Sequence, residues 1–244
     1  MAAVTALSIG GLATHSAAPA APPEAAAASA DEVSADTDFL FRLGMMEGHL
    51  MIGHQLIAAH QSALGLPHYG HPVRELYSDI EDYLAAKRFP PFRDQLIALE
   101  ALATAAPESA ATEKAYQSVI ATLHKARETA PAALRASLPQ MIQICSDTID
   151  AASGEYGQAI EQGKVTALVE YHDSKGYLAY VAEALAALRA AHPDAASQGL
   201  LARFGAVLAK AQWIVEPLLP DPTPRASLAD YRTIVAEGAA IAKE

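Results

Sequence analysis

The sequence predicts an all-α protein, an antiparallel helical bundle of about seven to eight helices. Of its 244 residues, 52% are hydrophobic but only 6% are aromatic. Alanine and leucine, which propagate helices, are frequent, whereas the β-branched and aromatic residues that suit strands are sparse. Apolar residues also recur with the helical period of about 3.6, and prolines or glycines separate these periodic segments.

Residues 1–31 are expected to lie outside the folded domain. They begin with an uncharged apolar stretch and continue as an Ala/Pro tract, which is typical of a secretory signal peptide followed by a disordered spacer. The basic residues that usually begin such a signal are missing, so a low-complexity tail is the alternative. We therefore expect a periplasmic or secreted protein with a single helical-bundle domain over residues 32–244.

In the first half of the domain, a long helix capped by Asp36 or Thr37 is expected to stop at Gly65. Residues 66–71 then form a loop, and Pro72 begins a second helix. Further helices cover residues 92–105 and, from Ser109 or Thr112, the segment up to Pro131.

In the second half, a fifth helix is expected over residues 132–161, with a kink or a start at Pro139. Gly163 separates it from a sixth helix over residues 164–191. A seventh helix around Trp213 and, after a proline-rich loop, a last helix over residues 227–242 complete the bundle.

The charge balance excludes nucleic-acid binding. The formal net charge is −11, from 28 acidic and 17 basic residues, so the protein repels phosphate backbones and attracts cations. The apolar stretches are shorter than the roughly 18 residues of a membrane span, so we expect a soluble protein that is not embedded in a membrane. The single cysteine, Cys145, excludes an internal disulfide and Cys-rich metal clusters, and its apolar surroundings predict a buried position.

The segment from Glu47 to Glu75 is rich in histidine, with residues 49, 54, 60, 68 and 71. An antiparallel hairpin would bring His60, His68, His71 and Glu75 together. Imidazoles with a carboxylate suit zinc, copper, iron or nickel. Alternatively, the histidines are exposed or capping residues, and Glu75 complements the helix dipole of the first turn.

His49 is a further candidate ligand. It lies about 16 Å from His60 along an ideal helix, so these two cannot share one ion. Nearby methionines, residues 45, 46 and 51, would suit Cu(I), although methionine at helical spacing is more often core filling. Three glycines in the same helix, residues 44, 48 and 53, indicate that another helix or a bound group approaches its backbone closely.

The second candidate segment, residues 154–185, carries Glu170, His172 and Asp173. The helix that holds them is apolar on several sides, so we expect it to be central. A buried Glu170 or Asp173 would need a cation or a histidine as its partner.

This segment resembles the extracytoplasmic helical region of bacterial iron permeases. The resemblance lies in Tyr156, in the Gly163-Lys164-Val165 turn, and in a helix with Glu170-Tyr171, an acid at position 173 and Gly176-Tyr177. It implies that Glu170 and Asp173 handle iron. His172 departs from the family pattern, and the membrane helices of a permease are missing, so transport itself is not implied.

These observations predict a protein that binds a transition metal, iron or copper with zinc as a third choice, for uptake, buffering or delivery, with a membrane transporter or another protein as partner. Two alternatives are a non-catalytic interaction bundle with incidental histidines and a metal-dependent oxidase or hydrolase. The sequence contains no G-x-S-x-G, H-E-x-x-H, E-x-x-H, phosphate-loop or dinucleotide motif, and we predict no catalytic residue. The predicted metal ligands are His49, His60, His68, His71, Glu75, Glu170, His172 and Asp173.

Overall fold

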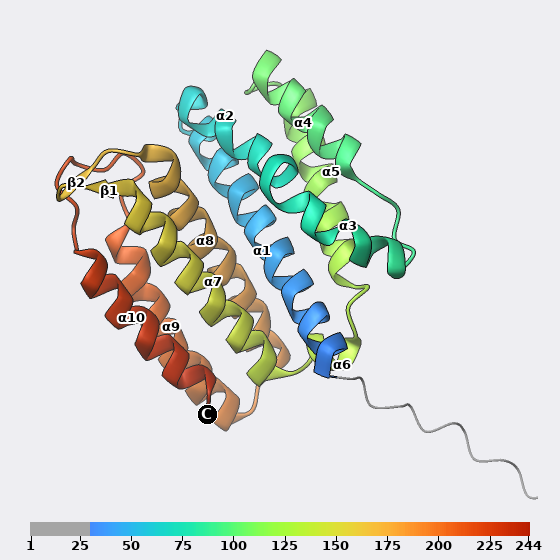
Figure 1. The fold of residues 1–244 in the computed structure, drawn as a ribbon, viewed down its shortest axis with the longest axis vertical. Helices are drawn as coiled ribbons and strands as arrows, with labels where there is room; N and C mark the ends of the chain where they lie inside the picture. Colours follow the sequence, from blue (N-terminus) through green and yellow to red (C-terminus); the bar gives the residue numbers. More distant parts are fainter. Residues whose placement is uncertain (1–29) are drawn as a thin grey trace, which may run out of the picture.

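The computed structural model describes residues 30–244, and this part of the chain is a bundle of α-helices (Figure 1). The prediction of an all-α bundle is therefore confirmed. The segment set apart as residues 1–31 lies, except for its last two residues, outside the described residues.

Helix α1 (Ala30–Ala58) runs through the middle of the bundle and packs most extensively against α8 on one side and α2 on the other (Figure 1). The α2 side also holds α3, α4 and α5, and the α8 side holds α7, α9 and α10. The remaining bounds are α2 (Ser62–His71), α3 (Tyr77–Ala86), α4 (Arg93–Ala105), α5 (Ala110–Arg127), α6 (Ala132–Arg135), α7 (Leu138–Ala159), α8 (Leu168–Ala191), α9 (Ala195–Ile214) and α10 (Leu228–Ala242).

Helix α1 ends seven residues before Gly65, where the sequence placed its end. His60 adopts a left-handed conformation with φ of 57°. Its amide donates to Ile57 O, and the Gln61 amide donates to Leu56 O, which is the pairing of a Schellman motif. A histidine occupies the position that glycine usually takes, so no residue at this point signals the end of a helix.

The expected loop over residues 66–71 is helical instead. It belongs to α2, which contains Pro67 in its interior. Burial of His68 and Tyr69 in this segment shows that packing overrides the local preference of proline. The chain continues without a break into a π-helical segment, η1 (Pro72–Leu76), in which the Tyr77 amide donates to Pro72 O. Pro72 therefore begins a π-helical turn, and the regular helix α3 starts at Tyr77.

The fifth expected helix is divided, and Pro139 lies in the first turn of α7, where its missing donor costs nothing. Between α7 and α8 the chain forms a hairpin of two short strands, β1 (Ile160–Glu161) and β2 (Lys164–Val165). Gln162 and Gly163 at its tip both have positive φ, 49° and 74°, as a two-residue hairpin turn of type I′ requires. The expectation of continuous helix to residue 161 and from residue 164 was therefore wrong, because this turn reverses the chain.

The apolar core surrounds α1 and α8. Leu43, Leu50 and Val181 are fully buried. Cys145 is buried as predicted, and burial raises the pKa of its thiol to about 12. Met46 is also buried, and the other two methionines of α1 pack against the core, in agreement with the core-filling interpretation.

Candidate metal centre

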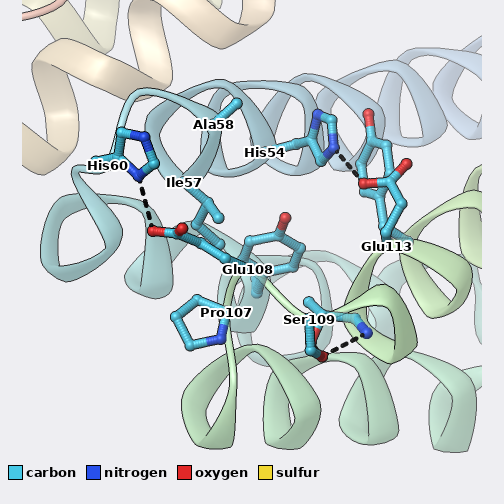
Figure 2. Close-up of a pocket in the computed structure, with 11 residues that line it drawn as sticks. His54, Ile57, Ala58, His60, Pro107, Glu108, Ser109 and Glu113 are labelled. Carbon is cyan, nitrogen blue, oxygen red and sulfur yellow. Dashed lines mark hydrogen bonds and ion pairs between the residues drawn. The ribbon is translucent and has the colours of Figure 1, made fainter.

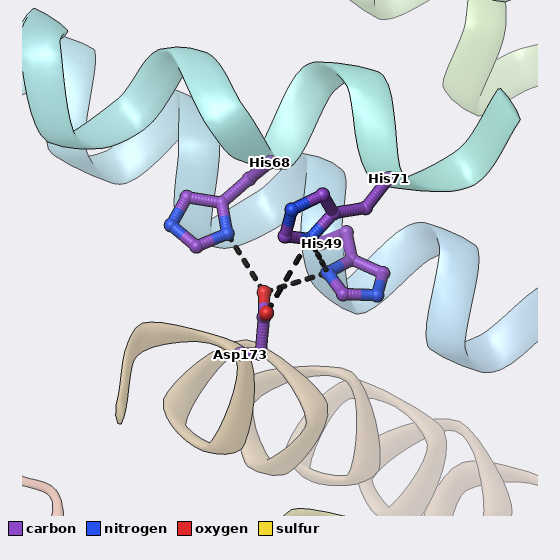
Figure 3. Close-up of side chains that lie close together, drawn as sticks. All are labelled: His49, His68, His71 and Asp173. Atoms are coloured by element: carbon purple, nitrogen blue, oxygen red, sulfur yellow. Dashed lines mark hydrogen bonds and ion pairs between the residues drawn. The ribbon is translucent and has the colours of Figure 1, made fainter. Parts of the chain in front are cut away.

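Four side chains from three helices meet in the interior between α1, α2 and α8 (Figure 3). Asp173 of α8 lies at the centre. The Nδ1 atoms of His49 and His68 are each 2.7 Å from its Oδ1 atom, and His71 Nδ1 is 3.3 Å from its Oδ2 atom. One potential ligand atom from each residue lies within 4.8 Å of all the others.

Glycines allow α1 and α8 to approach closely enough for these contacts. A Cβ atom built on Gly176 of α8 would lie 2.4 Å from the backbone oxygen of Gly48 in α1. The two helices therefore touch through their backbones, next to His49 on α1 and one turn beyond Asp173 on α8.

A second pair of glycines brings α2 against α1. A Cβ atom on Gly65 would lie 2.8 Å from Gly53 O. Gly65 lies one turn before His68, so this contact sets the position of the α2 histidines. Gly48 and Gly53 therefore mark places where another helix approaches α1 closely: α8 at Gly48 and α2 at Gly53.

The cluster is almost completely removed from solvent. Asp173 is 4% exposed, His49 1% and His68 0%, whereas His71 lies half-buried at the edge. Burial by itself would raise the pKa of Asp173, but hydrogen bonds from His49, His68 and His71 outweigh it and hold this pKa well below its usual range. The carboxylate is therefore charged, and hydrogen bonds from the three imidazoles stabilise it.

His49 and His71 respond differently to this environment. Burial lowers the pKa of His49, although Asp173 counteracts part of the effect. For His71, burial also acts to lower the pKa, but Asp173 and then Glu75 outweigh it, so its pKa is raised.

Groups behind the histidines approach two of the rings. The Tyr177 hydroxyl lies 2.9 Å from His49 Nε2, and a Glu75 carboxylate oxygen lies 3.8 Å from His71 Nε2. Such outer contacts set the tautomer and direction of a ligating imidazole. Tyr177 was not predicted as a site residue. Its spacing of one turn from Asp173 puts both on the same face of the helix, and this could have identified it.

The structure therefore brings together four of the eight predicted ligands: His49, His68, His71 and Asp173. Glu75 borders this group through His71, and its side chain is 55% exposed. His172 is fully buried next to the group, where its Nε2 donates to Leu218 O over 2.8 Å. Glu170, in the first turn of α8, is half-buried and lies outside the group.

His60 lies apart from the cluster, and the expected hairpin that would join it to His68 and His71 does not form. Its side chain is 80% exposed, with Nδ1 3.0 Å from Glu108. With His54, which pairs with Glu113 at 2.7 Å, it lines a cavity of about 250 Å³ between the end of α1 and the start of α5 (Figure 2). Each of these histidines has a carboxylate partner of its own, so neither is available to the buried cluster.

One segment of the chain is similar to a known protein family. Residues 131–217 match the family model of the iron permease-associated 4-helix bundle domain, which confirms the resemblance found over residues 154–185. The match covers α6 to α9 and contains Asp173, His172 and Tyr177, but His49, His68 and His71 lie outside it. No curated protein and no solved structure matches the chain.

No helix among residues 30–244 is both long enough and apolar enough to cross a membrane.

Proposed function

We propose that this protein binds one transition-metal ion, preferably iron, through His49, His68, His71 and Asp173, and handles it for an iron permease outside the cytoplasm. The observation that carries the proposal is the convergence of three imidazole Nδ1 atoms on one buried carboxylate. Two of the three histidines are almost completely buried, although histidine is usually only partly buried in proteins.

Part of the geometry already matches the ligand spacing around a small ion. Ligand atoms about 2.1 Å from a tetrahedral ion stand roughly 3.4 Å from one another. The two contacts at 3.3 Å, His71 Nδ1 to Asp173 Oδ2 and to His49 Nδ1, already have this separation. The 2.7 Å contacts from His49 and His68 to Asp173 are hydrogen bonds that the ion would replace.

The donor set narrows the choice of metal. Imidazole and carboxylate ligands suit iron, copper(II), zinc and nickel, whereas Cu(I) prefers thiolates and thioethers. Within the described residues the group does not contain Cys145. The family match of the segment that holds Asp173 supports iron, and the net charge of −11 favours the approach of cations.

Elemental analysis of protein purified without an affinity tag tests the proposal. We expect about one equivalent of metal in the wild type, and loss of that metal in Asp173→Asn and in the double variant His68→Ala/His71→Ala. His60→Asn is the matched control, because it removes an exposed histidine outside the cluster at a left-handed position that asparagine tolerates.

A second measurement ranks the metals. Addition of an ion at about 100 times its Kd stabilises the folded state by roughly 2.7 kcal/mol, so Fe(II), Cu(II) and Zn(II) are compared by the shift in Tm. Failure of all three to bind more tightly than millimolar, or equal binding by wild type and Asp173→Asn, contradicts the proposal.

A further inference from the structure

The rings of His68 and His172 are neighbours in the interior, and each has a nitrogen that lacks a partner within residues 30–244. Their ring centroids are 5.8 Å apart with an interplanar angle of 78°, and both residues are 0% exposed. Among the described residues, His68 Nε2 and His172 Nδ1 are buried atoms without a hydrogen-bond partner. Buried polar groups are nearly always paired, so two such atoms on neighbouring rings require an explanation.

The hydrogen bond from His172 to the α9–α10 loop determines which of its nitrogens is protonated. His172 Nε2 lies 2.8 Å from the backbone oxygen of Leu218. A carbonyl oxygen only accepts hydrogen bonds, so Nε2 carries the hydrogen. In the neutral ring the other nitrogen, Nδ1, is therefore a bare acceptor.

The state of His68 depends on what its Nδ1 atom binds. Without metal, Nδ1 donates to the Asp173 carboxylate over 2.7 Å, so in the neutral ring Nε2 is an acceptor. The neighbouring ring, His172, then also offers only an acceptor at its unpaired nitrogen. With metal on Nδ1, the hydrogen of the neutral ring moves to Nε2. His68 then offers a donor, and the neighbouring ring of His172 offers an acceptor.

We propose that His172 is a positioning residue of the metal centre, whose Nδ1 atom accepts a hydrogen bond, through one buried water, from the Nε2–H group of metal-bound His68. This inference rests on the proposed function. When His68 binds metal, its Nε2–H group can pair with the acceptor on His172. Without metal, both nitrogens are acceptors and cannot pair. His172 therefore strengthens metal binding without contacting the ion. Outer partners of this kind typically change metal affinity by about 10-fold to 100-fold.

Three substitutions separate the two nitrogens of His172. In His172→Asn the amide oxygen takes the place of Nδ1 and keeps an acceptor for His68. His172→Gln keeps a donor near Leu218 O but places no acceptor at the Nδ1 position, and His172→Phe removes both groups. The matched control is Tyr171→Phe, which removes a hydrogen bond of 3.1 Å to Pro217 O in the same loop and leaves the His68–His172 pair intact.

Zinc is the probe, because it is diamagnetic and suits this donor set. Its Kd is measured by competition with a chelator. We expect His172→Gln and His172→Phe to weaken zinc binding by about 10-fold or more, and His172→Asn and Tyr171→Phe to remain within about three-fold of wild type. Thermal unfolding of the metal-free variants shows whether each is folded.

Long-range ¹H–¹⁵N spectra of wild-type protein provide a readout that needs no substitution. We expect His68 to carry its hydrogen on Nδ1 without metal and on Nε2 with zinc, and His172 to keep its hydrogen on Nε2 in both states. A zinc-loaded His68 protonated on Nδ1 overturns the inference, and so does wild-type affinity in folded His172→Phe. In those cases the wild type still binds zinc and the proposed function stands, whereas a wild type that binds no metal refutes both.

Discussion

Gly48 and Gly176 are in backbone contact where α1 crosses α8. A Cβ atom on Gly176 would lie 2.4 Å from Gly48 O, and one on Gly48 would lie 3.0 Å from Gly176 O. His49 directly follows Gly48, and Asp173 lies one turn before Gly176. The two side chains form a 2.7 Å hydrogen bond across the same crossing. The separation of the two helices therefore determines whether the candidate centre can form.

Gly176→Ala is expected to destabilise the protein and to disturb the centre. The new methyl group meets backbone atoms, which cannot rotate away, and overpacking of this kind costs about 1–3 kcal/mol. Alanine returns up to about 1 kcal/mol through its helix propensity, so we expect a net loss of roughly 1–2 kcal/mol in urea denaturation.

Gly199→Ala in α9 is the control for that substitution, because a Cβ atom there meets no atom of the described part of the chain within 4 Å. It should raise the free energy of unfolding by about 0.5–1 kcal/mol. Equal stability changes at positions 176 and 199 would contradict the packing argument.

Tyr177→Phe tests the hydrogen bond behind His49. The substitution removes a buried hydroxyl 2.9 Å from His49 Nε2 while it keeps the aromatic ring. We expect metal affinity to fall by about 10-fold and the metal-free protein to lose roughly 1 kcal/mol. Chelator competition and denaturant titration measure the two effects, and an unchanged affinity would show that Tyr177 only fills space.

Glu155 of α7 should make stability depend on pH. Burial and then the negative charges of Asp173 and Glu75 raise the pKa of Glu155 from 4.5 to about 7. Between these values the folded state holds a proton that the unfolded state has released, so stability falls as the pH rises from about 4.5 to 7. The contribution is favourable at pH 5 and lost at pH 8.

Glu155→Gln stays neutral and should therefore gain stability relative to wild type as the pH rises from 5 to 8. Denaturant unfolding of the metal-free proteins measures this difference. Glu161→Gln, an exposed position on β1, changes the net charge equally and serves as control. Parallel pH profiles for wild type and Glu155→Gln would refute the assignment.

Glu47 forms the main buried ion pair between α1 and α5. It is 3% exposed, and its carboxylate lies 2.6 Å from Arg127 and 2.7 Å from His124. Glu47→Ala leaves the Arg127 guanidinium without this partner, and breaking a buried pair typically costs about 3–5 kcal/mol.

The double variant Glu47→Ala/Arg127→Met should recover part of the loss, because it removes both charges. His124, which is half exposed, is left intact in both variants, so its contribution cancels. Equal stability of the single and double variants would show that packing, and not the unpaired charge, causes the loss. Urea denaturation measures all three proteins.

The sequence alone predicts the helical class and most helix positions, because these depend on local features. The period of apolar residues indicates helices over most of α3 to α10, and Pro139 indicates the start of α7. The predicted helix boundaries were wrong where a residue adopted a conformation that is unusual for its type. His60 ends α1 in a left-handed conformation, and packing keeps the segment around Pro67 helical.

The candidate centre illustrates the division between local and tertiary information. The sequence identified the histidine-rich segment, the acidic residue at position 173 and a close approach at the glycines of α1. It placed His60 with His68 and His71, because a turn was expected after Gly65. The structure instead joins His49, His68 and His71 to Asp173.

The types of ligand were therefore determined by the sequence, and their combination was decided by the tertiary structure. Residue type and helical spacing reveal which side chains could bind a metal and which share a face. Which faces meet depends on contacts between residues more than 100 positions apart, such as His49 and Asp173. Two glycine contacts, Gly48 with Gly176 and Gly53 with Gly65, set those distances, and only the packed bundle shows which glycine lies against which.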